Sequence, residues 1–184
     1  MIEPWPSIET TLQGDYEVFK VRRDVRRSPR TGRNHPFHLI EAPDWVNIVP
    51  ITPDGQLVMV EQYRHGSERV TLEIPGGVMD PSDISPLAAA RREMIEETGY
   101  DSEYIEYLGV VAPNPAIQTN QCFSFLARDV HAAELPSLDH AEDIAVRLIG
   151  PDQVPALIAE GAVSHALVVA AFYFLDRRLD VRCP

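Results

Sequence analysis

An acidic helix beside a glycine turn constrains the fold of this chain more than any other feature of the sequence. The helix has a signal at each end, because Ser85 can cap its first turn and Gly99 can take the left-handed conformation that ends a helix. Pro86 suits the first helical position, so the sequence predicts a helix over residues 86–98. At 3.6 residues per turn, three carboxylates share an arc of about 100° and apolar residues occupy the other side. These carboxylates are Glu93, Glu96 and Glu97.

The clustered negative charge calls for a positive partner. Like charges three or four residues apart destabilise a helix by a few tenths of a kcal/mol per pair. Mg²⁺ and Mn²⁺ prefer carboxylate oxygens and leave coordination positions for phosphate oxygens and water. The preceding Glu73-Ile-Pro-Gly-Gly77 is typical of a strand that ends in a glycine turn and brings bare backbone to the helix. The alternative is a solvated acidic face, but the strand and turn favour a metal site facing phosphate.

These residues resemble the signature of the Nudix hydrolases, G-x5-E-x7-R-E-U-x-E-E-x-G-U, in which U is apolar. The matching positions are Gly77, Arg92, Glu93, Met94, Glu96, Glu97 and Gly99, with Tyr100 as a looser match at the end. Asp83 stands where the signature has its first glutamate, and eight residues rather than seven separate it from Arg92. The resemblance implies an α/β (α+β) fold, a Nudix α-β-α sandwich with a mixed sheet. The two departures affect the loop and leave the helix complete.

The order of elements over residues 16–176 resembles one branch of that family, which hydrolyses ADP-ribose and nucleoside diphosphate sugars. The corresponding segments are strands at 16–21, 37–42 and 45–52, a Gln62-Tyr63-Arg64 turn, and a strand at 73–77. We therefore expect residues 1–44 to form a region of N-terminal antiparallel strands and residues 45–184 the hydrolase domain. N-terminal sheets commonly pair subunits in this branch, so the resemblance implies a homodimer with residues 1–44 as the dimerisation arm.

Hydrophobic patterns predict the remaining elements. Strands are expected at residues 56–63, 103–112, 121–128 and 144–149, and helices at 151–160 and 164–178. Ser164 is the expected cap of the last helix. The stretch Ser28-Pro-Arg-Thr-Gly32 predicts a hairpin turn. Around it, between Lys20 and Arg33, lie seven basic residues and one acidic residue, which indicates either a solvated hairpin or a basic arm near an anionic substrate.

Composition limits the partners of the chain. A net charge of −12 argues against nucleic acid, because phosphate backbones are bound by basic surfaces. No apolar run reaches the roughly 18 residues of a membrane span, and the first residues lack the pattern of a secretion signal. We therefore expect a cytoplasmic protein without a membrane partner. Cys122 and Cys183 lie sixty-one residues apart without metal-binding spacing and are expected to be reduced thiols.

The resemblance and the helical spacing together suggest roles for the acidic residues. Glu93 and Glu97, at positions i and i+4, are the first candidates to bind Mg²⁺ (or Mn²⁺), with the Gly76 carbonyl as a backbone ligand. Glu96 is a third candidate ligand or could activate the water. Arg92 is expected to orient the glutamates, unless it forms an ordinary salt bridge on the helix surface.

The general base is expected in the loop at residues 131–143. Glu142 resembles the family's acidic residue before the next strand and is the candidate for base or metal ligand. A mobile acidic loop is the alternative. The same loop also offers Glu134, Asp139, His140 and Asp143. An imidazole could act as the base, but a lone loop histidine such as His140 is more often only solvated.

Candidate substrate contacts come from three places. Arg64 could pair with a phosphate in a bidentate manner, and Glu73 could accept a hydrogen bond from a base or ribose. Each could equally form an internal salt bridge. Trp45 or Tyr63 could stack on a base, although strand packing explains both residues as well.

These assignments predict metal-dependent hydrolysis of the diphosphate bond of a nucleoside diphosphate sugar of the GDP-mannose, ADP-glucose or ADP-ribose type. The products would be a nucleoside monophosphate and a sugar phosphate, formed by water that a carboxylate activates. Residues 113–120 lack an acidic residue that many ADP-ribose hydrolases have there, which slightly favours a GDP- or ADP-linked hexose. The alternatives are a non-hydrolysing nucleotide-sugar sensor of the same fold and a nucleoside triphosphate pyrophosphatase.

Overall fold

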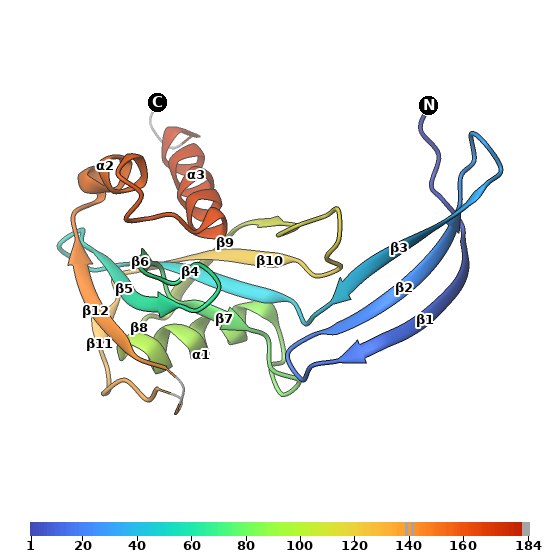
Figure 1. Cartoon of the computed structure of the whole chain (residues 1–184). Coiled ribbons are helices and arrows are strands. Elements are labelled where there is room, and N and C mark those ends of the chain that lie inside the picture. The colour runs from blue at the N-terminus through green and yellow to red at the C-terminus, as the bar shows by residue number, and fades with distance from the viewer. Residues whose placement is uncertain (139, 141, 182–184) are drawn as a thin grey trace. The chain divides into compact units, whose positions relative to one another are not determined.

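The computed structural model describes residues 1–138, 140 and 142–181, and the side chains of residues up to 178. Asp139, one of the loop carboxylates considered above, and Cys183 lie outside these described residues. The chain forms two compact units, whose elements are labelled in Figure 1. The smaller unit combines Met1–Pro43 with Ala112–Gln121, and the larger combines Asp44–Val111 with the chain from Cys122 onward. The smaller unit thus includes residues 112–121, which the sequence predicts to lie in the hydrolase domain at 45–184.

The smaller unit contains a three-stranded antiparallel sheet in the order β1-β2-β3. Its strands are β1 (Ser7–Asp15), β2 (Lys20–Arg27) and β3 (Asn34–Glu41). The predicted hairpin turn is confirmed, because the Ser28 N–H donates to the Arg33 carbonyl at 2.8 Å. The strand predicted at 16–21 is largely wrong: residues 16–19 form the β1–β2 turn, with Glu17 at φ 66°. Ile40 of β3 exchanges backbone hydrogen bonds with Ile117 and Thr119.

A charged cluster, rather than an apolar core, lies at the centre of this small sheet. Asp24 is 1% exposed and accepts hydrogen bonds from Arg26 at 2.8 Å and Thr10 at 3.1 Å. Arg22 lies 3.4 Å from the same carboxylate. Burial by itself would raise the pKa of Asp24, but these partners lower it below its usual value. At least two of the basic residues in the hairpin therefore hold the sheet together.

The larger unit is built on a seven-stranded mixed sheet. The main order is β12-β5-β4-β10-β9, with β6 paired to β5 and β7 paired to β4. Only β4 and β10 run parallel within it. Its strands are β4 (Trp45–Ile51), β5 (Leu57–Arg64), β6 (Arg69–Glu73), β7 (Gly76–Val78), β9 (Tyr104–Val111), β10 (Cys122–Arg128) and β12 (Ile144–Ile149). A separate two-stranded sheet pairs β8 (Tyr100–Asp101) with β11 (His131–Ala132).

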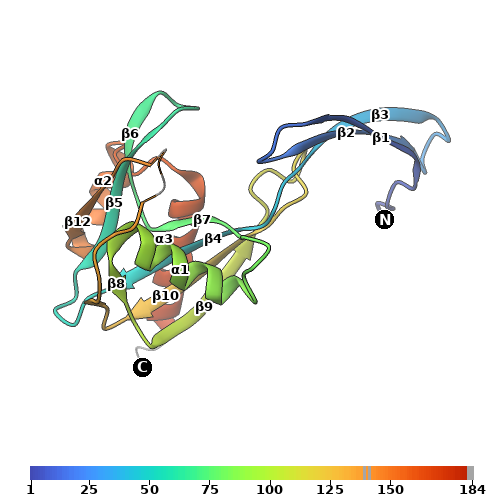
Figure 2. The same cartoon turned by 90° about the horizontal axis from the view of Figure 1, so that it is seen from below.

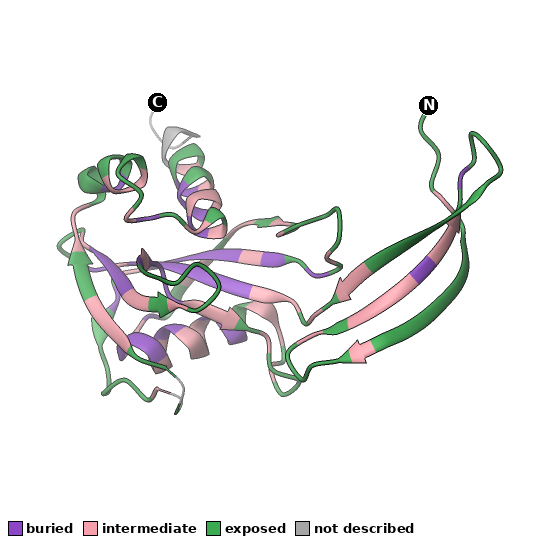
Figure 3. Cartoon of the chain, viewed as in Figure 1, coloured by how far each residue is buried: buried purple, intermediate pink, exposed green. Residues whose placement is uncertain are grey.

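Helices cover both faces of the large sheet. Helix α1 (Pro86–Thr98) lies on one face, while α2 (Val154–Ala159) and α3 (Ala166–Val181) lie on the other, as Figures 1 and 2 show from two directions. Strand β4 is buried on both sides: Val46 and Ile48 pack in the cluster with α1, and Val49 packs in the cluster with α3. Figure 3 shows this central burial. The predicted α+β sandwich with a mixed sheet is confirmed.

The structure corrects four predictions of local structure. The helix predicted at 151–160 is a short 3₁₀ turn, η1 (Pro151–Gln153), followed by α2. The Gln62-Tyr63-Arg64 turn lies inside β5, and the strand predicted at 73–77 is divided between β6 and β7. Ser164 is not the cap of α3, because the Leu167 N–H donates to the His165 ring at Nδ1. Over the residues that the structure describes, every helix is too short or too polar to cross a membrane.

Candidate active site

Helix α1 ends where the sequence predicts, and this fixes the direction of its carboxylates. Ser85 Oγ accepts a hydrogen bond from the Ala88 N–H at 3.1 Å, and Gly99 takes φ 73° and donates to the Ile95 carbonyl. The apolar side of the helix packs on the sheet through the buried Ala90 and Met94. The glutamates on the remaining side therefore face the glycine turn at the start of β7.

Two glutamates of α1 are largely buried beside that turn. Glu97 is 4% exposed and accepts a hydrogen bond from the Gly76 N–H at 3.0 Å. Burial raises the pKa of Glu97 to about 8; the Gly76 N–H opposes this shift, while the charges of Glu93 and Glu142 add to it. Burial also raises the pKa of Glu93 to about 7, against the opposing effect of Arg92. Both carboxylates therefore lie where added positive charge would be strongly favoured.

The glycine turn leaves room for these carboxylates only because it has no side chains. A Cβ at Gly77 would lie 2.6 Å from Glu93 Oε1, and a Cβ at Gly76 would lie 2.4 Å from the Val46 carbonyl oxygen. Hard carboxylate oxygens beside bare backbone are suitable donors for Mg²⁺ or Mn²⁺. Among the described residues, no three carboxyl, imidazole or thiol groups are gathered into a complete metal site. Substrate oxygens and water would have to complete the coordination.

Gly77→Ala is expected to weaken Mn²⁺ binding by at least about tenfold, because the new methyl group would displace the Glu93 carboxylate. Its melting temperature should change little, since the displaced atoms are the end of a flexible side chain. Titration calorimetry with Mn²⁺ measures the effect. Gly66→Ala is the matched control, because a Cβ there would meet no atom within 4 Å. Unchanged Mn²⁺ affinity in Gly77→Ala would remove Glu93 from the metal site.

Arg92 connects the loop to the carboxylates of the helix. Its Nε and Nη2 donate to the two Asp83 oxygens at 3.2 and 2.9 Å. Its Nη1 lies 2.8 Å from Glu96 and 2.9 Å from Glu93. Asp83, the residue that departs from the expected glutamate, thus holds Arg92 in a bidentate pair. The contacts of Arg92 are those expected of a residue that orients the glutamates.

Arg64 and Glu73 bind each other. Arg64 Nε and Nη2 donate to the Glu73 carboxylate at 2.9 and 2.7 Å, and Thr71 Oγ1 donates to it at 2.7 Å. Burial would raise the pKa of Glu73, which is 2% exposed, but these hydrogen bonds lower it. The internal salt bridge is therefore present. The Arg64 side chain remains 42% exposed, and its Nη1 donates to no residue of the described chain. One edge of the guanidinium is left for a ligand.

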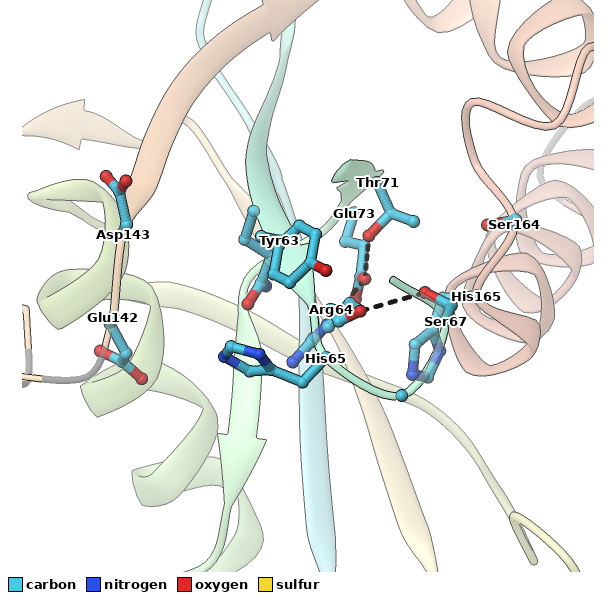
Figure 4. Close-up of a pocket in the computed structure, with 12 residues that line it drawn as sticks. Tyr63, Arg64, His65, Ser67, Thr71, Glu73, Glu142, Asp143, Ser164 and His165 are labelled. Carbon is cyan, nitrogen blue, oxygen red and sulfur yellow. Dashed lines mark hydrogen bonds and ion pairs between the residues drawn. The ribbon is translucent and has the colours of Figure 1, made fainter. Parts of the chain in front are cut away.

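A pocket of about 890 Å³ lies beside this ion pair. Figure 4 shows Glu142 and Asp143 on one side of it, Tyr63 and Arg64 in the middle, and His165 on the side of α3. Glu142 is close enough for its charge to raise the pKa of Glu93 and Glu97 and to act on Arg64. The pocket and the helix carboxylates therefore belong to one electrostatic neighbourhood.

The other candidates lie in different surroundings. Trp45 is half-buried at the start of β4, opposite Val78, and does not line this pocket. Tyr63 does line the pocket and is 47% exposed. Glu134 and His140 are exposed and are not among its lining residues. Glu96 is bound to Arg92 and more exposed than its two neighbours, with 43% of its side chain accessible.

Sequence reasoning missed several pocket residues, among them His65, Ser67, Thr71 and His165. Of these, His165 comes from the most distant part of the chain. It precedes α3 and lies far from Arg64 in the sequence, yet the charges of Glu73 and Arg64 act on its ring. The only local signal was its place at a helix start, which the sequence analysis assigned to Ser164. Its position in the pocket depends on long-range packing.

Comparisons with known proteins identify related sequences and a similar structure. A family model described as NUDIX domain matches residues 43–172. The methanol dehydrogenase activator of Bacillus methanolicus is 29% identical over 160 residues, which are 86% of this chain and 85% of that protein. The ADP-ribose pyrophosphatase of Bacillus subtilis (strain 168) is 26% identical over 146 residues, covering 79% and 78% of the two chains.

A solved structure described as an ADP compounds hydrolase superposes with a TM-score of 0.86. The match covers 99% of this chain and 97% of the other, at 20% identity. At that identity the likeness supports the fold alone.

Proposed function

Because the chain belongs to the NUDIX domain family, we propose that it hydrolyses the diphosphate bond of a nucleoside diphosphate sugar of the ADP-ribose, ADP-glucose or GDP-mannose type. The observation that carries this proposal is the pair of buried carboxylates, Glu93 and Glu97, beside a pocket that contains the exposed edge of Arg64. The similarity to the ADP-ribose pyrophosphatase of Bacillus subtilis supports a substrate of this class.

We assign a divalent cation, Mg²⁺ or Mn²⁺, to the glutamates of α1. Glu93 and Glu97 would hold it, with the Gly76 carbonyl and Glu96 as further candidates. When bound, the cation would neutralise the charge that develops on the diphosphate oxygens. Arg92, bound to Asp83, would keep Glu93 and Glu96 in place.

The protein's own side chains supply the other parts of the reaction. Arg64, held by Glu73, would donate from Nη1 to a diphosphate oxygen and so position the substrate. A water oxygen attacks one phosphorus while the bond from that phosphorus to the bridging oxygen breaks, and the second phosphate leaves as an anion. The proton of the water passes to a carboxylate, for which Glu142 is the first candidate and Glu96 the second. Trp45 or Tyr63 remains a candidate for stacking on the base.

The N-terminal unit is the proposed site of homodimer formation. Its sheet exposes three apolar side chains, Ile8, Leu12 and Phe37, whose exposed fractions are 47%, 58% and 39%. Apolar surface of this kind is a common feature of subunit interfaces. Light scattering on the purified protein tests the dimer. A cytoplasmic location and the lack of nucleic-acid or membrane partners stay predictions.

A regulatory role is the second candidate, since a relative at 29% identity is named as an activator of methanol dehydrogenase. A sensor that binds a nucleotide sugar without hydrolysing it would be one form of this role, whereas a nucleoside triphosphate pyrophosphatase is the alternative within the enzyme class. One panel of substrates distinguishes these three possible functions. Release of phosphate through an added phosphatase is measured for ADP-ribose, ADP-glucose, GDP-mannose, UDP-glucose and nucleoside triphosphates, with Mg²⁺ and with a chelator.

We expect Mg²⁺-dependent cleavage of at least one sugar nucleotide and little activity on triphosphates. A preference for triphosphates would replace the proposed substrate class. Binding of a sugar nucleotide in calorimetry without any cleavage would instead support the regulatory role.

A further inference from the structure

The pocket beside Arg64 contains an imidazole that the roles assigned so far do not use. We propose that His165 donates a hydrogen bond from Nε2 to a hydroxyl group of the sugar half of the substrate, and that it thereby contributes to substrate specificity. This inference rests on the proposed function, because it names the part of the substrate that the pocket accepts. Four features of the structure support it.

The first feature is the fixed position of the segment that carries His165. The Leu72 N–H of β6 donates to the Ala162 carbonyl at 3.0 Å, on one side of the histidine. On the other side, Asn47 Nδ2 of β4 donates to the Leu167 carbonyl at 3.2 Å. Two strands of the central sheet therefore hold the start of α3, and the ring of His165 is presented from a rigid element.

The second feature is the tautomer of the ring. Nδ1 accepts the Leu167 N–H at 3.2 Å, so its lone pair is directed at the backbone and it carries no proton. In the neutral ring, Nε2 must then carry the hydrogen. Burial lowers the pKa of His165, with Arg64 adding to the effect and Glu73 opposing it, which favours the neutral form. Nε2 is therefore the ring nitrogen that can donate a hydrogen bond.

The third feature is that this donor is available. No described residue accepts a hydrogen bond from His165 Nε2. Figure 4 shows the ring beside Ser67, on the opposite side of the pocket from Glu142. A polar group in that position gains most from a ligand that brings an oxygen acceptor to it.

The fourth feature is the chemistry of the surrounding wall. Among the described lining residues, hydroxyl, amide and imidazole groups predominate and none is Val, Leu, Ile, Met or Phe. A nucleobase stacks best on large aromatic faces, and the only side chain of this kind in the described wall is Tyr63, beside two smaller imidazole rings. A sugar instead presents several hydroxyl groups that match such a lining. The polar groups other than the charged ones are Gln62, Tyr63, His65, Ser67, Thr71, Ser164 and His165.

The test compares two substrates that differ only in the sugar. ADP-glucose has the hydroxyls, whereas adenosine 5′-(methyl diphosphate) has the same diphosphate bond and a methyl group in place of the sugar. Three variants are measured with both substrates. His165→Asn keeps a cap oxygen for the Leu167 N–H but cannot reach the pocket, His165→Ala removes both functions, and His131→Asn changes an exposed histidine of β11.

We expect His165→Asn to lower kcat/KM for ADP-glucose by about 5- to 10-fold, the effect of one lost hydrogen bond. Its kcat/KM for the methyl ester should stay within about twofold of wild type, and its melting temperature should be unchanged. His131→Asn should resemble wild type with both substrates. His165→Ala should lose the same discrimination and also some thermal stability.

Two results would overturn the inference. An equal loss with both substrates would indicate a structural role for His165, and no loss with either would limit it to capping α3. If the wild-type protein binds the substrates without hydrolysing them, their dissociation constants are measured by calorimetry and compared between the variants in the same way. Absence of hydrolysis by the wild-type protein would thus contradict the hydrolase proposal. An unchanged ratio of the kcat/KM values for the two substrates in His165→Asn would contradict the His165 proposal.

Discussion

Glu97→Gln is expected to lower kcat/KM for the preferred sugar nucleotide by about a thousandfold, which corresponds to roughly 4 kcal/mol of lost transition-state stabilisation. The substitution removes one negative charge at the most buried of the α1 glutamates and keeps the size of the side chain. A neutral amide is a much poorer ligand for Mg²⁺ than a carboxylate. Initial rates over a range of Mg²⁺ concentrations measure both the loss and any shift in metal affinity.

The thermal stability of the variant distinguishes a loss of metal binding from unfolding. Without metal, the melting temperature of Glu97→Gln at pH 8 should equal or exceed that of wild type, because an amide oxygen can still accept the Gly76 N–H. Burial also opposes the ionisation of Glu97 in the wild type, as its raised pKa shows. Glu103→Gln, at an exposed position between β8 and β9, serves as the matched control. Activity in Glu97→Gln above about a tenth of wild type at saturating Mg²⁺ would contradict the metal assignment.

Arg64→Met should damage both stability and activity. Removing one partner of a buried ion pair costs about 3–5 kcal/mol, and the partial exposure of Arg64 reduces our expectation to about 2 kcal/mol. The reason is that Glu73 would stay buried without its counter-ion. Loss of the phosphate contact should lower kcat/KM by about a hundredfold, typical of a charge-assisted donor. Urea denaturation and initial rates measure the two effects.

A double variant distinguishes the two roles of Arg64. When Arg64→Met is combined with Glu73→Gln, neither position carries a charge, and the new amide oxygen at position 73 can still accept a hydrogen bond from the Thr71 hydroxyl. We therefore expect most of the lost stability to return while the activity stays low. If activity returned together with stability, Arg64 would have only a structural role, and the phosphate contact would have to be assigned elsewhere.

The parts of the site that depend on local sequence could be predicted. Helix α1 was predicted to the residue because Ser85, Pro86 and Gly99 act within one turn of its ends. The common direction of Glu93 and Glu97 follows from helical spacing alone. The central strands were also predicted well, because β4 and β10 are buried and strongly apolar.

The parts that depend on distant contacts could not be predicted. From the sequence, Arg64 and Glu73 could be either substrate contacts or partners in an ion pair. They form the ion pair because they lie on the paired strands β5 and β6. The place of His165 depends on the contact of α3 with β4 and on the contact of the preceding loop with β6. Strand β1 was missed because its alternation is weak and its side chains are mostly exposed, so little hydrophobic periodicity marks it.

The path of the chain has a consequence for how such a protein can change during evolution. The chain passes between the two units three times, after residues 43, 111 and 121. Deleting the residues before 44 would remove Ile40, the backbone partner of Ile117 and Thr119, while residues 112–121 remained behind. Loss of the N-terminal strands alone would therefore leave residues 112–121 without these backbone hydrogen bonds. Each such change would need a compensating change in the β9–β10 connection, so the two segments are expected to be inherited together.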